Sequence, residues 1–218
     1  LASVEEAVLA WLVAAGKTRG EMRILLVLVA ALALCQCASA PRAGGRPVVI
    51  VGLAEAPDEA EPRYTMLWRK VNAEGRFADR GGQRMIEFTT HSRDTVRVAG
   101  IPGEFAVARV EPGTYALDGV FAELRERGLT YTAQGNIIGP ERPAFEARRG
   151  EVIFLGIWQA SVDGHLAVVR PWRIDEADLR AVARAANIDG PVQLRRSYTL
   201  AVPCSPRRIH PSLSRQIC

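Results

Sequence analysis

From residue 47 to about residue 203, hydrophobic positions form short runs, continuous or alternating with polar residues, and turn-forming residues interrupt them about every ten positions, as in antiparallel β-domains. The pattern predicts strands over residues 48–51, 64–71, 85–88, 95–98, 105–110, 114–117, 151–158, 166–169 and 192–202. The run Glu151–Trp158 is apolar on both faces, which indicates a central strand. The predicted fold class is therefore mainly β, an antiparallel β-sandwich.

Two turns are predicted from proline and glycine. Pro112-Gly113 presets the first turn angle and accepts the positive φ that follows, which predicts a hairpin between residues 105–110 and 114–117. Asp163-Gly164 suits the tight turn of a second hairpin, from residues 151–158 into 166–169.

One short helix is predicted near the C-terminus. Asp175 can cap its first turn, Glu176 and Arg180 can pair on its exposed side, and Gly190 marks its exit. One helix face carries apolar residues at i, i+3, i+4 and i+7 spacing: Leu179, Val182, Ala183 and Ala186.

The segment from Met22 to Cys37 has the pattern of an export signal. Arg23 leads into an uncharged run that reaches Cys35, within the roughly 7–15 residues of a signal core and short of the roughly 20 that span a bilayer. Residues 1–21 precede this signal and begin with Leu, so we expect them not to belong to the native product. Residues 38–47 are rich in Pro, Gly and Ala, which predicts a flexible linker.

Residues 22–40 resemble the signal of bacterial lipoproteins, in which Leu and two small residues precede an acylated cysteine. If Cys35 is the acceptor, Leu32 and Ala33 fit the pattern and Leu34 departs from it; if Cys37 is the acceptor, Leu34 fits and Gln36 departs. Cys37 is slightly favoured, because cleavage before it discards Cys35, and acylation of Cys37 then leaves Cys204 and Cys218 as a matched pair. The alternative is plain secretion, with cleavage after residue 40, and a retained anchor is a third possibility. The resemblance implies an outer-membrane protein that faces the periplasm.

Residues 110–115 and 150–156 carry a second resemblance. Val-Glu-Pro-Gly-Thr-Tyr and Gly-Glu-Val-Ile-Phe-Leu-Gly are similar to a hairpin and a strand of small envelope lipoproteins with prealbumin-like β-sandwiches. Phe154 replaces the commoner Tyr of that family. The resemblance covers about residues 63–187 and implies the fold, with no catalytic residues to carry over.

The remaining cysteines, Cys204 and Cys218, lie in a basic, Pro-rich tail over residues 204–218. An exported chain meets an oxidising compartment, where this pair can close a loop of about 15 residues. The alternative is a frayed tail with free thiols. A basic C-terminal region consists of Arg195-Arg196, Arg207-Arg208 and Arg215, and it can contact anionic envelope polymers or lipid headgroups, or can simply be solvated.

Composition and motifs exclude several function classes. The net charge of +4 is mild, and no basic stripe with interleaved aromatics predicts nucleic-acid binding. The three histidines lack metal-ligand spacing, so we expect neither a metal nor a cofactor. Ser161, Asp163 and His165 could form a hydrolase site, but no nucleophile elbow or oxyanion loop accompanies them. Three of the four tryptophans are expected to fill the core: Trp68, Trp158 and Trp172. The alternative is a sugar-binding platform, which requires them to be exposed on one face.

These observations predict a lipid-anchored envelope protein whose β-sandwich over residues 48–203 binds or scaffolds and does not catalyse. Its expected partners are the membrane, through an N-terminal lipid, and other envelope proteins or anionic envelope polymers. The alternative function is a secreted periplasmic hydrolase that uses Ser161 and His165.

Overall fold

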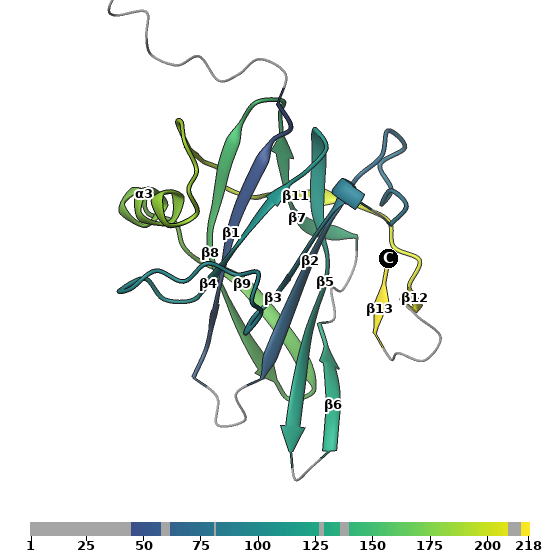
Figure 1. The fold of residues 1–218 in the computed structure, drawn as a ribbon. Helices are drawn as coiled ribbons and strands as arrows, with labels where there is room; N and C mark the ends of the chain where they lie inside the picture. Colours follow the sequence, from purple (N-terminus) through teal and green to yellow (C-terminus); the bar gives the residue numbers. More distant parts are fainter. Residues whose placement is uncertain (1–44, 58–61, 81, 127–128, 136–139, 209–214) are drawn as a thin grey trace, which may run out of the picture. The chain divides into compact units, whose positions relative to one another are not determined.

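The structure, a computed structural model, describes residues 45–57, 62–80, 82–126, 129–135, 140–208 and 215–218. They belong to one compact unit, Pro41–Cys218. Two sheets of mostly antiparallel strands pack face to face as a β-sandwich, with one short helix near the C-terminal end of the described residues (Figure 1). The predicted fold class is confirmed.

The first sheet, sheet A, has the strand order β10-β8-β1-β4, with β9 also paired to β8. Its strands are β1 (Val48–Glu55), β4 (Glu104–Arg109), β8 (Val152–Asp163), β9 (Leu166–Arg173) and β10 (Gln193–Leu194). Strand β8 is central, as its two apolar faces predict. Its pairings with β1 and β10 are parallel, whereas the sequence predicts an antiparallel sheet throughout.

The second sheet, sheet B, has the order β11-β7-β5-β2-β3, with β6 also paired to β5. Its strands are β2 (Arg63–Lys70), β3 (Met85–Thr89), β5 (Gly113–Glu126), β6 (Leu129–Gln134), β7 (Glu141–Ala147) and β11 (Tyr198–Ala201). A 3-10 turn, η1 (Gly82–Arg84), precedes β3. The short strands β12 (Arg207–Arg208) and β13 (Gln216–Ile217) pair with each other.

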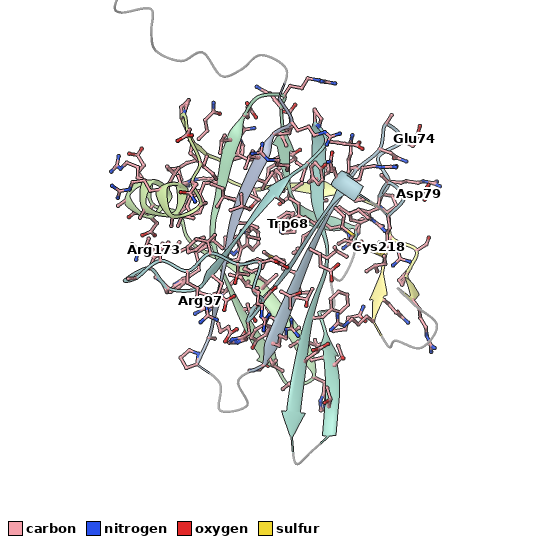
Figure 2. The ribbon with its side chains drawn as sticks, in the orientation of Figure 1. Trp68, Glu74, Asp79, Arg97, Arg173 and Cys218 are labelled. Atoms are coloured by element: carbon pink, nitrogen blue, oxygen red, sulfur yellow. A yellow bond between two sulfur atoms is a disulfide. The ribbon has the colours of Figure 1, made fainter. Side chains whose placement is uncertain are left out.

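Aromatic side chains fill the space between the sheets. Trp68 of sheet B is fully buried and meets Trp158 of sheet A edge to face, with ring centroids 5.3 Å apart. Phe145 lies against the same Trp68 ring at 5.3 Å. Figure 2 shows Trp68 in the middle of the sandwich. These residues confirm the predicted core positions of Trp68 and Trp158.

The predicted hairpin at Pro112-Gly113 is wrong. Strand β4 pairs with β1 in sheet A, and β5 pairs with strands of sheet B, so the turn carries the chain from one sheet to the other. The hydroxyl of Tyr115 lies 2.9 Å from the carbonyl oxygen of Glu111, which ties the start of β5 back across this turn. Turn chemistry predicts a reversal, but it does not say which sheet receives the chain.

Two of the predicted strands, residues 95–98 and residues 192–202, do not form as predicted. Residues 95–98 form only an isolated bridge, between Val96 and Phe105, within a loop. Residues 192–202 form two short strands in different sheets, β10 on β8 and β11 on β7. The Asp163-Gly164 hairpin between β8 and β9 is confirmed, with Asp163 opposite Leu166 and a φ of 58° at Gly164.

Each sheet has a cover on its outer face (Figure 1). Helix α3 (Glu176–Ala185) and the loops around residues 96–101 and 188–192 cover sheet A. The C-terminal segment covers sheet B, where Ile217 packs on Leu67 and Phe121. In Figure 2, Arg173 lies on the α3 side and Cys218 on the opposite side.

Helix α3 begins as predicted and ends earlier than predicted. The carboxylate of Asp175 accepts a hydrogen bond from the amide of Ala177 at 2.6 Å, which satisfies one free donor of the first turn. Asn187, with a φ of 51°, ends the helix, while Ile188 donates to the carbonyl of Ala183 at 2.9 Å. This is a Schellman motif, so Asn187 takes the role that the sequence assigns to Gly190.

Candidate binding site

The residues predicted to carry function do not come together in one site. Cys35 and Cys37, the candidate lipid-attachment residues, lie outside the described residues. Cys204 and Cys218 form a disulfide, with Cα atoms 4.8 Å apart. Ser161 faces Val168 across the β8–β9 ladder, whereas His165 lies in the turn beyond Asp163 and Leu166. The register therefore does not set His165 opposite Ser161.

Trp172 is the exception to the predicted tryptophan core. Its side chain is 48% exposed, whereas Trp68 and Trp158 are at most 1% exposed. It lines an open pocket of about 270 Å³ on sheet A, whose other walls come from the ends of β8 and β9 and from the segment that follows β10. The pocket is lined by Leu155, Ile157, Pro171, Trp172, Arg173, Ile174, Arg196 and Ser197. We call it the Trp172 pocket.

A bulge in the β8–β9 ladder places Trp172 in this pocket. Ile157 pairs with Arg173 and Trp158 pairs with Pro171, so Trp172 has no partner in the register. A bulge of this kind re-aims a side chain and breaks the regular alternation of the strand. Trp172 lies on the same outward parity as the exposed Leu166 and Val168, and the inward parity of Ala167 and Val169 falls to its neighbours.

Gly156 makes the pocket geometry possible on the β8 side. Its φ is 80°, and a Cβ atom at this position would lie 2.6 Å from the carbonyl oxygen of Arg173. Both observations require glycine, because side-chain-bearing residues rarely adopt this φ and the neighbouring atom is backbone. The conformation at Gly156 thus brings the end of β9 close to β8, next to Trp172.

The two arginines that line the Trp172 pocket differ in whether a carboxylate neutralises them. Arg173 donates from Nη2 to Oδ1 of Asp178 at 2.9 Å, and the Asp178 side chain is only 5% exposed. This pair fastens helix α3 to the end of β9. Arg196 is exposed and forms no hydrogen bond or ion pair with the residues that the structure describes. The pocket therefore carries one neutralised and one available guanidinium.

A second, larger groove of about 610 Å³ runs along α3. Its floor is apolar, with Leu179, Ala183 and Ile188, and its rim carries Arg180 and Glu176. The rim charges pair with each other at 3.8 Å, on the exposed side that the sequence predicts. The groove lacks an exposed aromatic residue among its described lining residues.

Glu104 organises a cluster of polar residues on the loop before β4. Its side chain accepts hydrogen bonds from the backbone amide of His91 at 3.0 Å, from the Thr95 hydroxyl at 2.7 Å and from Arg97. The second nitrogen of the His91 ring, Nε2, lies 2.9 Å from Glu55. Burial alone would raise the pKa of Glu104, but these donors together hold the pKa below its ordinary value. The carboxylate therefore anchors the loop.

A buried ionic cluster lies on the outer face of sheet B, under the C-terminal segment. Nε of Arg69 lies 3.2 Å from Asp118, with both side chains fully buried. Asp118 also accepts from the amide of Cys218 at 2.8 Å, and Arg142 reaches the sulfur of Cys218 at 3.0 Å. The ring of Phe77 lies under both guanidiniums, 4.6 Å from Cζ of Arg69 and 5.3 Å from that of Arg142. We call this set the Asp118 cluster.

The tail over residues 204–218 is held to the sandwich where the structure describes it. Besides the contacts of Cys218, Arg215 pairs with Glu123 and lies over the ring of Phe121 at 5.4 Å. The cationic side chain of Arg215 is thus used inside the molecule. The prediction that basic residues of this tail contact an anionic surface therefore loses Arg215 as a contributor.

Within the described ranges, no group of three or more His, Cys, Asp or Glu residues could hold a metal ion. None of the described helices is long and apolar enough to cross a membrane.

The exposure of Trp172 is the feature that sequence reasoning missed. The signal that could have found it is Pro171, because a proline inside a strand indicates an edge strand or a bulge. The alternating pattern stops at the same place. By contrast, nothing near Arg196 in the sequence shows that it approaches residues 171–174.

The fold and these sites define the described part of the chain as a β-sandwich with an open pocket at Trp172 and with a cover on the outer face of each sheet. No family model, no curated protein and no solved structure matches the chain.

Proposed function

We propose that this chain is a lipid-anchored binding module of a bacterial cell envelope, without catalytic activity of its own. The binding role rests on one observation above the others, the exposed Trp172 in an open pocket next to the available charge of Arg196. Tryptophan and arginine are the residues that most often carry binding energy when they line a pocket.

Two features support placement in the envelope. The uncharged run that ends at Cys35 and Cys37 resembles a lipoprotein signal. The disulfide between Cys204 and Cys218 fits an oxidising compartment, where such bonds persist. These two features lie at opposite ends of the chain and are independent of each other.

A double substitution tests the anchor. Cells that make the native protein should hold it in the membrane fraction, and Cys35→Ser with Cys37→Ser should release it into the soluble fraction. The two single variants identify the acylated cysteine, because only one of them should cause release. A double variant that stays in the membrane fraction would contradict the lipid anchor.

The intact mass of the natural product sharpens the same test. It should correspond to a chain that starts at Cys37 or Cys35 and carries acyl groups. A mass that includes residues 1–21, or a start after residue 40 without acyl groups, would instead favour a retained leader or plain secretion.

The hydrolase alternative has its own test. Ser161→Ala should abolish turnover of ester or amide substrates if Ser161 is a nucleophile. In a binding module the same variant should leave ligand-dependent thermal stabilisation unchanged, because Ser161 does not line the Trp172 pocket.

A further inference from the structure

The Trp172 pocket combines three chemical features. One wall is an exposed indole, one is an available guanidinium at Arg196, and Ser197 adds a hydroxyl. The described residues that line it include no carboxylate. The nearest carboxylate partner of a lining residue, Asp178, is occupied by Arg173.

The indole suits a ring with polarised C–H bonds. The face of an aromatic ring carries the negative part of its quadrupole, so it attracts the positive edge of a neighbouring group. A pyranose sugar presents such C–H bonds on one face and hydroxyls around its edge. Stacking on Trp172 would therefore leave the hydroxyls free to reach Ser197 and the backbone.

The guanidinium of Arg196 adds a preference for a ligand with a negative charge. A planar guanidinium binds a carboxylate with two parallel hydrogen bonds, which a neutral hydroxyl cannot reproduce. Because Asp178 already neutralises Arg173, the pocket has room for one further negative charge at Arg196.

Resting on the binding role proposed above, we propose that the Trp172 pocket binds a uronic-acid residue of an anionic polysaccharide, with the sugar ring on Trp172 and its carboxylate on Arg196. The volume of about 270 Å³ is just below the roughly 300–1,000 Å³ of most small-molecule sites. It therefore suits one sugar ring of a longer chain.

The surroundings of Trp172 favour this ligand over a protein partner. A stable protein interface buries about 800 Å² on each side around an apolar centre. The other exposed apolar residues of β9, Leu166 and Val168, are separated from Trp172 by Arg170 and Pro171. Along β9, the apolar surface on the side of Trp172 is thus interrupted at Arg170.

The test uses the full-length protein in detergent, titrated with trigalacturonate and, in parallel, with neutral maltotriose. Trigalacturonate should change the tryptophan fluorescence saturably and bind at least tenfold more tightly than maltotriose. Trp172→Phe should remove the fluorescence change, because the other described tryptophans are buried. Calorimetry should still detect binding in this variant, since phenylalanine keeps an aromatic face.

Two further variants separate the ring from the charge. Trp172→Ala should abolish binding of both sugars. Arg196→Gln should weaken trigalacturonate about tenfold, as expected for one charged hydrogen-bonded pair, and should leave the weak maltotriose affinity unchanged. Both side chains are exposed, so neither variant should alter the unfolding midpoint.

Matched controls come from exposed residues outside the pocket. Tyr198→Ala removes an aromatic residue that is 46% exposed on β11, and Arg149→Gln removes an exposed arginine from the turn before β8. Neither residue lines the pocket, so both variants should bind trigalacturonate as the native protein does.

Three results would overturn the proposal: no binding of trigalacturonate at millimolar concentration, equal binding of maltotriose, or equal loss in the control variants. A partner protein that protects Trp172 in place of a sugar would also overturn it. These measurements use purified protein and do not depend on the anchor. The double variant of Cys35 and Cys37 could be released from the membrane while the purified protein binds no sugar. That result would contradict this inference and would still support the envelope placement.

Discussion

The covers on the two outer faces of the sandwich are held by different forces. On sheet A, Leu179 and Val182 of α3 pack on Phe105, Phe154 and other apolar residues. On sheet B, the C-terminal segment is held by the Asp118 cluster and by a disulfide, with Ile217 as its buried apolar contact near Phe121. The first cover is mainly apolar, with the Arg173–Asp178 pair as its ionic contact, and the second is mainly ionic and covalent.

Substitutions in the two kinds of cover should lower the free energy of unfolding by different amounts. Trimming an apolar side chain removes contacts in proportion to the volume that is lost. Removing one partner of a buried ion pair leaves the other charge without compensation, which costs more than the pair itself contributes. The cover on sheet B should therefore be the more sensitive to a single conservative substitution.

The largest effect is expected from Asp118→Asn. The amide can still accept a hydrogen bond from Cys218, but Arg69 and Arg142 lose their negative neighbour in a buried site. The free energy of unfolding should fall by about 3–5 kcal/mol. Urea unfolding followed by fluorescence measures this loss, and Glu176→Gln is the control, since its exposed pair with Arg180 should contribute at most about 0.5 kcal/mol. Equal losses in the two variants would show that the Asp118 cluster is not under strong electrostatic constraint.

The next largest effect is expected from breaking the disulfide. Cys204→Ser removes the bridge and keeps Cys218, whose amide and sulfur contact Asp118 and Arg142. The closed loop spans 14 residues of sequence separation, for which chain entropy gives about 3 kcal/mol. Hydrogen exchange should rise in β12, β13 and the facing part of β5, while α3 keeps its protection. Equal exchange changes at α3 would mean that the two covers are not independent.

The same contrast explains what the sequence predicts and what it does not. The cover on sheet A depends on a local pattern, because the 3.6-residue period of Leu179, Val182 and Ala183 and the cap at Asp175 lie within a few residues of one another. The Asp118 cluster joins residues that are far apart, with Asp118 and Cys218 separated by 100 positions. No local signal marks an arginine that will be buried.

The sequence also does not predict which of the two sheets a strand joins, and the reason is related. The turn at Pro112-Gly113 is predicted correctly as a reversal, but the choice between a hairpin and a crossing to the other sheet depends on which strands lie near. The position of Trp172 without a register partner likewise depends on a bulge that is defined by two strands. The periodicity of the sequence predicts which face of a helix or strand a residue occupies. The packing between elements then determines which residues meet in a site.

A smaller effect is expected when the apolar cover is trimmed. Leu179→Ala should lower the free energy of unfolding by about 2 kcal/mol, the low end for buried leucine, because the side chain lies at the edge of the cluster and is 7% exposed. Arg184→Ala, on the exposed face of the same helix, is the control and should change little. If Leu179→Ala lowered the free energy of unfolding by more than Asp118→Asn does, the cover on sheet A would be the more sensitive of the two.

The smallest effect is expected from Glu104, which anchors the loop that completes the apolar cover. Thr95, His91 and Arg97 donate to its carboxylate and hold its pKa below the ordinary 4.5. A group whose pKa is lower in the folded state stabilises the protein above its unfolded pKa, and this stabilisation is lost as the pH falls through the folded value. Glu104→Gln should therefore cost about 1.5 kcal/mol at pH 7, and the difference from the native protein should shrink only below about pH 4.5. Urea unfolding of both proteins between pH 7 and pH 3 measures this difference. A difference near zero at every pH would show that the loop is held by the shape of the side chain, which glutamine keeps, and not by the charge of Glu104.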